Sequence, residues 1–298
     1  MTTEINVDSL LPPEMARKAE AVGVAKAQGR AHYLFLLAVL AGAFIAMGAV
    51  FATVVFSGGI TVSTAAGVKA YSAGLPYGVT RLLGGVVFSL GLILVIIGGA
   101  ELFTGNVLIV MAWASRKVTT GGLLRNWGIV YLGNFVGALL SAVLVFLSGQ
   151  HLGGSGTVGL TALNIARAKV ELDFLPAVAS GILCNALVCM AVWLTFSART
   201  TVDKILAIVF PISAFVAAGF EHCIANMFFV PVGLMIKDFA GPEFWSLIGK
   251  GAGDYASLTW GAFLVKNLLP VTLGNVIGGG LLVAAVYWLI YLWKPAQR

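Results

Sequence analysis

Two short segments place polar side chains inside long apolar runs with the same spacing. Residues 99–106 and 219–226 both read G-x-E-x-x-x-x-N, with a glutamate two positions after a glycine and an asparagine five positions after the glutamate. Hydrocarbon solvates such groups poorly, so polar residues within an apolar run are candidates for a functional site. The repeat predicts a polar pathway built from two related halves of the chain.

His222 and Thr104 are the side chains of these segments that suit contact with a solute. An imidazole changes its charge near neutral pH, so His222 is the candidate proton donor. The hydroxyl of Thr104 can donate or accept, which suits either a gate hydrogen bond to His222 or a contact with the substrate. No second histidine stands at metal-ligand spacing, and we therefore expect no metal ion and no cofactor.

Glu101 and Glu221 are expected to brace the chain rather than to carry protons. Two carboxylates beside an anion path would repel the anion, whereas each can accept hydrogen bonds from backbone N–H groups freed where a helix breaks. Asn106 and Asn226 are expected to tie helices together by the same logic.

The composition indicates an integral membrane protein. Hydrophobic residues make up 59% of the 298 residues and charged residues 10%, whereas soluble domains average about 25% charged residues. About 20 apolar residues cross a bilayer as a helix, and six stretches are long enough: residues 33–57, 79–114, 126–149, 174–197, 205–237 and 262–293. The predicted fold class is an all-α membrane protein with six transmembrane helices in the lipid bilayer.

The basic residues predict the orientation. Four lysines and arginines precede the first span, three follow the second, two follow the fourth and two end the chain. The positive-inside rule then puts both termini in the cytoplasm. The net charge of +6 reflects this topology, and we expect no nucleic-acid partner.

The two halves repeat each other. Asn134 and Asn275 each lie eight positions after another asparagine, within the matching stretches 126–137 and 267–278. Because each half has three crossings, the second half must enter the membrane from the opposite face, which makes an inverted repeat. Repeat one covers about 33–149 and repeat two about 174–293. Spans two and five are too long for one straight crossing, so we expect both to be broken.

Residues 1–32 form a polar cytoplasmic segment before the channel domain of residues 33–298. A surface helix is expected over 14–27, serving either as a membrane-interface anchor or as a gating plug. Residues 154–159 satisfy G-x-G-x-x-G, but no strand precedes them, so we interpret them as a flexible outer loop rather than a dinucleotide site.

At these residues the chain resembles the formate/nitrite transporter family, and within it the formate channels. The most specific stretches are residues 8–13, 88–94, 101–104, 215–227 and 270–275. The resemblance implies an aquaporin-like fold, a homopentamer with one pore per protomer, and the inner membrane of a bacterial cell. It implies transport of formate and related small monovalent anions, passively or linked to protons, with a nitrite or hydrosulfide channel as the alternative.

The resemblance also assigns residues to the pore. His222 and Thr104 would face each other at its centre, and Lys169, Asn185 and Asn275 would lie near it. Two constrictions follow in the same way: the periplasmic one from Phe88, Leu92 and Phe215, and the cytoplasmic one from Leu102, Phe103 and Val188. In the mechanism that we expect, Lys169 and the positive ends of the half-helices attract the anion. His222 then shares or donates a proton, so the narrowest passage is made as the neutral acid and flux depends on pH.

Two other classes of protein fit the sequence less well. A membrane-embedded enzyme or electron-carrying subunit should show a nucleophile–base pair, a metal cluster or haem-ligand histidines, and none is visible. A purely structural scaffold would not need a histidine and two carboxylates within broken helices. We therefore expect a transporter and not an enzyme.

Overall fold

The computed structural model of the chain describes residues 8–58, 60–62 and 71–293. Six helices in this part of the chain are long and apolar enough to cross a membrane. They are α2 (Ala31–Phe56), α3 (Tyr77–Gly98), α6 (Thr120–Leu147), α8 (Phe174–Ser197), α9 (Thr201–Ala218) and a last helix over Ala262–Tyr291, which runs through η4 (Ala262–Leu268), α12 (Leu269–Val276), η5 (Ile277–Ala285) and α13 (Val286–Tyr291). The expected six-span helical fold is confirmed.

Spans two and five are broken, as expected. After α3 the chain leaves the helix and resumes as α4 (Phe103–Asn106), η1 (Val107–Ile109) and α5 (Val110–Ala114). After α9 it resumes as α10 (Cys223–Phe239), in which every residue from Cys223 to Leu234 is buried. A helix buried on all sides lies inside the bundle, where its broken start is shielded from lipid.

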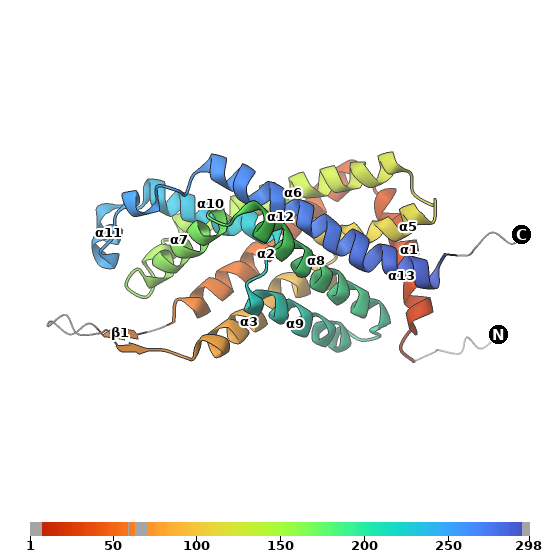
Figure 1. Cartoon of the computed structure of the whole chain (residues 1–298), viewed down its shortest axis with the longest axis horizontal. Coiled ribbons are helices and arrows are strands. Elements are labelled where there is room, and N and C mark those ends of the chain that lie inside the picture. The colour runs from red at the N-terminus through yellow and green to blue at the C-terminus, as the bar shows by residue number, and fades with distance from the viewer. Residues whose placement is uncertain (1–7, 59, 63–70, 294–298) are drawn as a thin grey trace, which may run out of the picture.

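The two ends of the bundle differ in what covers them (Figure 1). At one end lie α1 (Pro12–Ala27), α5 and α13. At the other end lie α7 (Thr157–Val170), α11 (Pro242–Ile248) and a hairpin of β1 (Ile60–Val62) and β2 (Tyr71–Ala73), in which Ile60 pairs with Ala73. Two short turns of helix, η2 (Gln150–Leu152) and η3 (Ala252–Tyr255), complete the connections.

The structure corrects the interpretation of residues 154–159 as a loop. Gly154 and Gly156 do form a turn with positive φ values of 60° and 85°, but Thr157 already begins α7. Residues 1–7 of the N-terminal segment, and Lys294 and Arg298 from the count of basic residues, lie outside the described residues.

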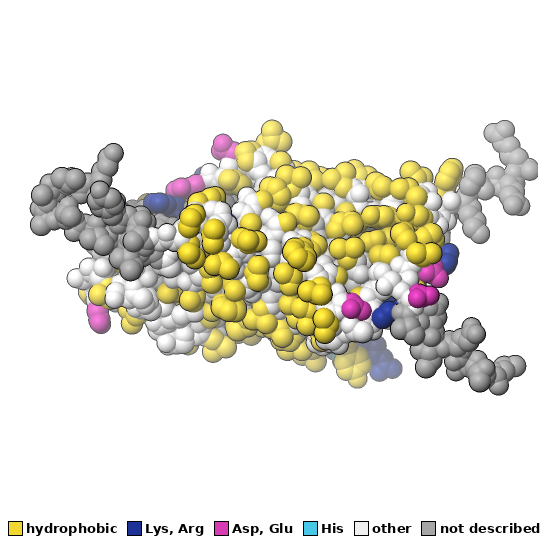
Figure 2. Space-filling model, turned by 90° about the horizontal axis from the view of Figure 1, so that it is seen from below, with side chains coloured by type: hydrophobic (Ala, Val, Ile, Leu, Met, Phe, Trp, Pro, Cys, Tyr) yellow, Lys and Arg dark blue, Asp and Glu magenta, His cyan; other side chains and the backbone are white. Residues whose placement is uncertain are grey.

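The helices of each half pack through small residues at matching positions. A Cβ on Gly137 of α6 would collide with the backbone carbonyl of Val39 in α2, and a Cβ on Gly278 in η5 would collide with that of Ile182 in α8. Such close approach requires glycine. The outside of the bundle is correspondingly apolar: Figure 2 shows hydrophobic side chains across the middle of one face, with most of the charged ones toward the two ends.

Candidate functional site

Each broken span turns at a glycine. Gly99 follows α3 and Gly219 follows α9, and both have a φ of +78°, a left-handed conformation that L-residues with a side chain rarely adopt. The turns then close with hydrogen bonds from Ala100 N to Val95 O and from Phe220 N to Phe215 O. These are the helix-ending bonds expected where a glycine follows the last turn.

Asn134 and Asn275 hold the chain across the two breaks. Asn134 Oδ1 accepts from Phe103 N (2.9 Å), and its Nδ2 donates to Glu101 O (2.9 Å) and to a carbonyl of α2. Asn275 Oδ1 accepts from Cys223 N (2.9 Å), and its Nδ2 donates to Glu221 O (3.0 Å) and to a carbonyl of α8. One asparagine thus satisfies backbone groups on both sides of each break.

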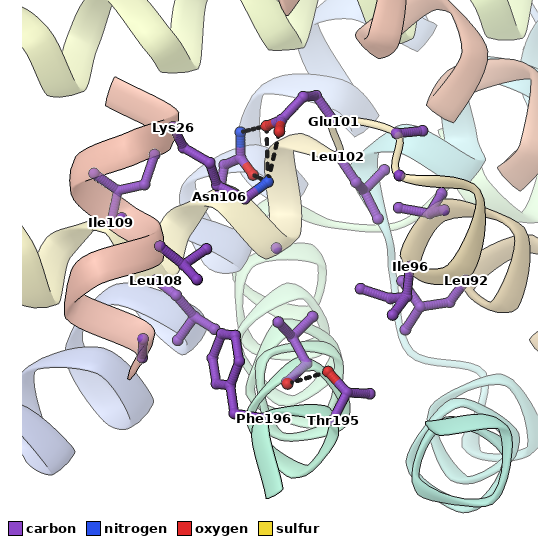
Figure 3. Close-up of a pocket in the computed structure, with 18 of the residues that line it drawn as sticks. Lys26, Leu92, Ile96, Glu101, Leu102, Asn106, Leu108, Ile109, Thr195 and Phe196 are labelled. Atoms are coloured by element: carbon purple, nitrogen blue, oxygen red, sulfur yellow. Dashed lines mark hydrogen bonds and ion pairs between the residues drawn. The ribbon is translucent and has the colours of Figure 1, made fainter. Parts of the chain in front are cut away.

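At the end of the molecule where α1 lies, Glu101 joins a buried cluster, the α1-side cluster. Lys26 Nζ contacts both carboxylate oxygens at 2.8 Å and Asn106 Oδ1 at 2.9 Å (Figure 3). Asn106 Nδ2 donates to Glu101 Oε2 (2.7 Å) and to Asn126 Oδ1 (3.0 Å). Asn126 in turn donates to Lys26 O (2.9 Å). The cluster fastens α1 to the break after α3.

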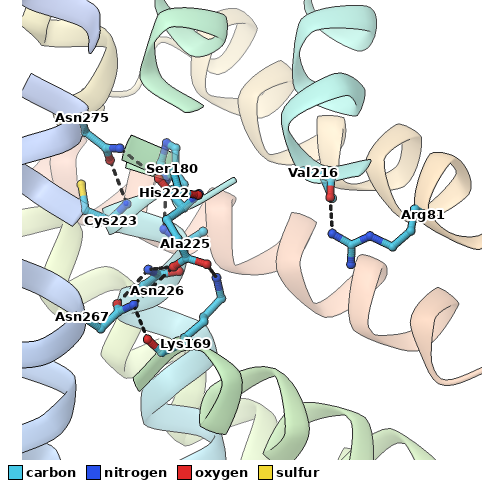
Figure 4. A network of polar contacts seen from close by, with 11 residues as sticks. Arg81, Lys169, Ser180, Val216, His222, Cys223, Ala225, Asn226, Asn267 and Asn275 are labelled. Atoms are coloured by element: carbon cyan, nitrogen blue, oxygen red, sulfur yellow. Dashed lines mark hydrogen bonds and ion pairs between the residues drawn. The ribbon is translucent and has the colours of Figure 1, made fainter. Parts of the chain in front are cut away.

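At the end where α7 lies, Glu221 joins an equivalent cluster, the α7-side cluster. Lys169 Nζ contacts Glu221 Oε1 at 2.8 Å (Figure 4). Asn226 donates to Glu221 Oε2 (2.6 Å) and Asn267 Oδ1 (2.8 Å), and Asn267 donates to Lys169 O (2.9 Å). This cluster fastens α7 to the break after α9.

The partners of the two glutamates differ from our expectation. We expected both carboxylates to accept from freed backbone N–H groups, but the hydrogen bonds that the structure gives them come from side chains of lysine and asparagine. The freed N–H groups of Phe103 and Cys223 are taken instead by Asn134 and Asn275. The physical reason is geometric: those asparagines lie on neighbouring helices and face the first residue after each break.

His222 and Thr104 meet between the two breaks, and both are buried. Thr104 Oγ1 lies 3.0 Å from His222 Nε2, and Ala225 N donates to His222 Nδ1 at 3.0 Å. Because Nδ1 accepts, a neutral imidazole carries its proton on Nε2 and donates it to Thr104. The hydroxyl hydrogen of Thr104 is then available to a second acceptor.

The backbone of Thr104 is held from α8. Asn185 Nδ2 donates to Thr104 O (3.2 Å) and to Asn275 O (2.7 Å), and Cys189 Sγ donates weakly to Thr104 O (3.4 Å). Asn185 therefore links the first break to the asparagine that spans the second. Cys184, Cys189 and Cys223 are all buried thiols, and the described residues contain no group of three His, Cys, Asp or Glu side chains that could hold a metal ion.

A pocket of about 270 Å³ opens on the α7 side of His222, which we call the α7-side pocket. Phe88 and Phe215 line it with their ring centroids 5.7 Å apart in an edge-on arrangement, and Phe215 stacks on His222 at 5.8 Å. Lys169 also lines the pocket, with Nζ 5.5 Å from the ring centroid of Phe229. The structure thus brings Phe88, Phe215 and Lys169 together with His222.

A second pocket of about 300 Å³, the α1-side pocket, lies under α1 (Figure 3). Leu102 lines it, and so does Leu92, which we had grouped with Phe88 and Phe215. Leu92 lies one helical turn beyond Phe88, which carries its side chain past the aromatic pair. Phe103 packs edge-on against Tyr131 of α6 at 4.9 Å, and Val188 is buried within α8.

Sequence reasoning missed two cations that line these pockets. Lys26 was overlooked, although Ala25-Lys26 and Ala168-Lys169 are the same dipeptide, and each lysine stands five residues before the first residue of a spanning helix. Arg81 was also overlooked, although it is a charged residue within the predicted second span. In both cases a charge close to or inside an apolar run was the available signal.

Comparison with known proteins identifies the family. The formate/nitrite transporter profile matches residues 13–289. The formate channel FocA of Escherichia coli (strain K12) is 48% identical over 285 residues, covering 96% of this chain and 95% of that protein. FocA of Haemophilus influenzae is 45% identical, and the match covers 92% of each chain.

Solved structures agree with this assignment. A pentameric formate channel with formate bound superposes with a TM-score of 0.79 at 48% identity, covering 88% of this chain and 98% of the other. An FNT family ion channel gives a TM-score of 0.73 at 25% identity, covering 93% and 98%. The profile match, the identity over nearly the whole length and the shared fold lead to one conclusion: the chain belongs to the formate/nitrite transporter family.

Proposed function

We propose that this chain is a membrane channel for formate and related small monovalent anions. The observation that carries the proposal is the His222–Thr104 pair, which lies at the meeting point of two broken helices beside an aromatic-lined pocket. The named relatives are formate channels. A nitrite or hydrosulfide channel of the same family is the alternative, and the polar groups at the pore centre suit any small anion with an acceptor oxygen or sulfur.

The physical obstacle to such transport is the charge of the substrate. A bare anion in a dry constriction costs from about 3 to more than 10 kcal/mol, depending on how much water follows it. Phe88 and Phe215 present only aromatic rings, which have no N–H or O–H group to replace the hydrogen bonds of that water. Lys169 and the N-terminal end of α10 attract the anion toward His222, where its charge can be cancelled.

The tautomer of His222 defines how that cancellation proceeds. With Nδ1 accepting from Ala225 N, the neutral imidazole offers the anion a hydrogen bond from Nε2. It cannot give that proton away without becoming an imidazolate. A full transfer needs the imidazolium, so the ring must give up the Ala225 bond and take a proton on Nδ1. Formate then takes the Nε2 proton, passes the narrowest part as formic acid and returns that proton to the neutral imidazole as it leaves, so the net charge that crosses is that of the anion.

The distribution of basic residues and the named relatives support a membrane, an orientation and an assembly for the channel. The pore works in the inner membrane of a bacterial cell, with both termini and the α1-side pocket facing the cytoplasm and the α7-side pocket facing the periplasm. Five copies assemble, each with its own pore. Repeat one over about 33–149 and repeat two over about 174–293 form the pore, and α1 of the N-terminal segment covers the cytoplasmic end. Phe88, Leu92 and Phe215 narrow the periplasmic side of the centre, and Leu102, Phe103 and Val188 narrow its cytoplasmic side.

The test compares His222→Phe with His222→Gln in proteoliposomes, measuring formate flux at two pH values. Gln keeps a hydrogen-bond donor for Thr104 but cannot carry a proton. Without neutralisation a barrier of at least about 3 kcal/mol returns, which is roughly a hundredfold in rate. Both variants should therefore lose most of the flux and all of its pH dependence. Unchanged flux and pH dependence in His222→Phe would refute the mechanism.

A further inference from the structure

Arg81 lies at the start of α3 and reaches the far end of α9. Its Nε donates to Ala217 O at 3.2 Å. Its Nη2 donates to Val216 O, the bond drawn in Figure 4. The guanidinium carbon lies 4.8 Å from the ring centroid of Phe56, at the end of α2. The side chain is partly buried and lines the α7-side pocket. A group held on two sides in this way has a fixed position.

The next turn of α3 makes room for this arrangement. A Cβ on Gly84 would collide with the ring of Phe56, and a Cβ on Gly85 would lie 2.6 Å from Ser213 O in α9. Two adjacent glycines therefore let Phe56 approach on one side and α9 on the other. Arg81 therefore lies between Phe56 at the end of α2 and the end of α9.

The carbonyls that Arg81 holds belong to the last turn of α9. Carbonyls at a helix C-terminus carry the negative end of the helix dipole, and of these two Val216 O also accepts from Gly219 N at 3.1 Å. Here that end points at the pocket through which the anion would pass, directly after Phe215 and just before Gly219. Two hydrogen bonds from a cation offset the negative potential of these carbonyls.

Apart from Arg81, the charged residues that line the α7-side pocket supply no net charge. Among the described residues they are Lys169, which attracts an anion only at close range, and Glu221, whose carboxylate Lys169 contacts at 2.8 Å. Arg81 instead bonds to neutral carbonyls. An arginine stays protonated at any working pH, so Arg81 leaves the pocket with one net positive charge.

We propose that Arg81 positions the end of α9 and supplies the net positive charge that draws anions into the α7-side pocket. The inference rests on the proposed function, because it assigns a role in anion transport. It predicts two separable effects. Loss of the charge weakens capture of anions that arrive from the α7 side. Loss of the hydrogen bonds to Ala217 O and Val216 O instead slows the movement of anions from the pocket to the pore centre.

The experiment measures formate currents in both directions across a planar bilayer that holds channels of one orientation, at low and high ionic strength set with sodium gluconate. Arg81→Gln should raise the half-saturating formate concentration on the α7 side by about tenfold at low ionic strength. High ionic strength should shrink the difference, because salt screens the charge. Arg81→Lys should keep capture within about twofold of the native protein, since it keeps the charge, but lower the saturated current, because it cannot bind two carbonyls with a fixed fork.

Lys250→Gln is the matched control. It removes one exposed positive charge beyond α11, at the same end of the molecule but outside the pocket lining, so it should leave capture unchanged.

The proposal is overturned if Arg81→Gln matches the native protein, if it lowers currents equally in both directions at every ionic strength, or if Lys250→Gln reproduces its effect. If Arg81→Gln fails to assemble, Arg81→Lys decides: an increase in the half-saturating concentration as large as about tenfold overturns the charge assignment. Absence of formate current in the native protein would instead refute the proposed function.

Discussion

The clusters on the two sides of the pore centre use the same residue types and hold them differently. On the α1 side, Lys26 contacts both oxygens of Glu101 and also Asn106. On the α7 side, Lys169 contacts one oxygen of Glu221, and Asn226 Oδ1 has no hydrogen bond among the described residues. The pair on the α7 side is also less exposed, with side chains 13% and 8% accessible against 28% and 11% for Lys26 and Glu101.

A comparison of the two halves distinguishes the residues that support the breaks from those that could act on a substrate. Glutamates and asparagines that hold the breaks occupy equivalent positions in both halves, whereas the residues at the centre do not. His222 stands where the first half has Leu102, and Thr104 stands where the second half has Ile224. The repeated residues brace the breaks, and the departures from the repeat put a titratable ring and a hydroxyl 3.0 Å apart.

Replacing each glutamate in turn by glutamine should give the largest difference in stability between the two clusters. Glu221→Gln leaves the Lys169 charge without an anion in a more buried place, which we expect to lower the free energy of unfolding by about 3 kcal/mol. Glu101→Gln should cost about half as much, because Lys26 keeps Asn106 and is more accessible to water. Thermal unfolding of the purified protein in detergent measures both.

The double variant Lys169→Met with Glu221→Gln is the control for that test. Removing both partners should recover part of the loss, because no buried charge is left unpaired. Equal losses in Glu101→Gln and Glu221→Gln would show that the two clusters are energetically equivalent despite their different geometry.

Much of the fold follows from local patterns. Long apolar runs predicted the six spans, and the length of spans two and five together with a glycine, a glutamate and an asparagine in each predicted the breaks. The spacing of Asn134 and Asn275 predicted the repeat, because it recurs without change. These features depend on neighbours along the chain, which the sequence displays directly.

The partners of the site residues could not be obtained in the same way. Lys26 and Glu101 are 75 residues apart, and Arg81 and Val216 are 135 apart, so their contacts depend on how helices pack. Leu92 lines the α1-side pocket although Phe88, one turn of α3 before it, lines the α7-side pocket, and spacing alone does not show which pocket a residue of α3 meets. The pairing of Thr104 with His222 at the pore centre came from family resemblance rather than from spacing.

Alanine substitutions at the two glycines that end α3 and α9 should differ in stability by a smaller amount. Gly99 and Gly219 share a φ of +78°, so alanine at either position should cost about 1 kcal/mol of conformational strain. A Cβ on Gly99 meets nothing within 4 Å, whereas a Cβ on Gly219 lies 3.4 Å from Arg81 Nη2. Gly219→Ala should therefore unfold at a lower temperature than Gly99→Ala. The difference should vanish in an Arg81→Gln background, and its persistence there would mean that Arg81 is not its cause.

The smallest expected effect concerns alkaline pH. Burial, and after it the nearby Lys204 and Arg199, hold the pKa of Lys18 below its ordinary value of 10.5. Lys18 lines the α1-side pocket, so that pocket should lose positive charge as pH rises through the lowered pKa, while Arg81 keeps the α7-side pocket charged. Formate currents that start from the α1 side should then weaken at an alkaline pH at which those from the α7 side persist. Lys18→Gln should abolish this asymmetry, whereas a parallel decline in both directions, or one that survives in Lys18→Gln, would assign the effect to the shared centre of the pore.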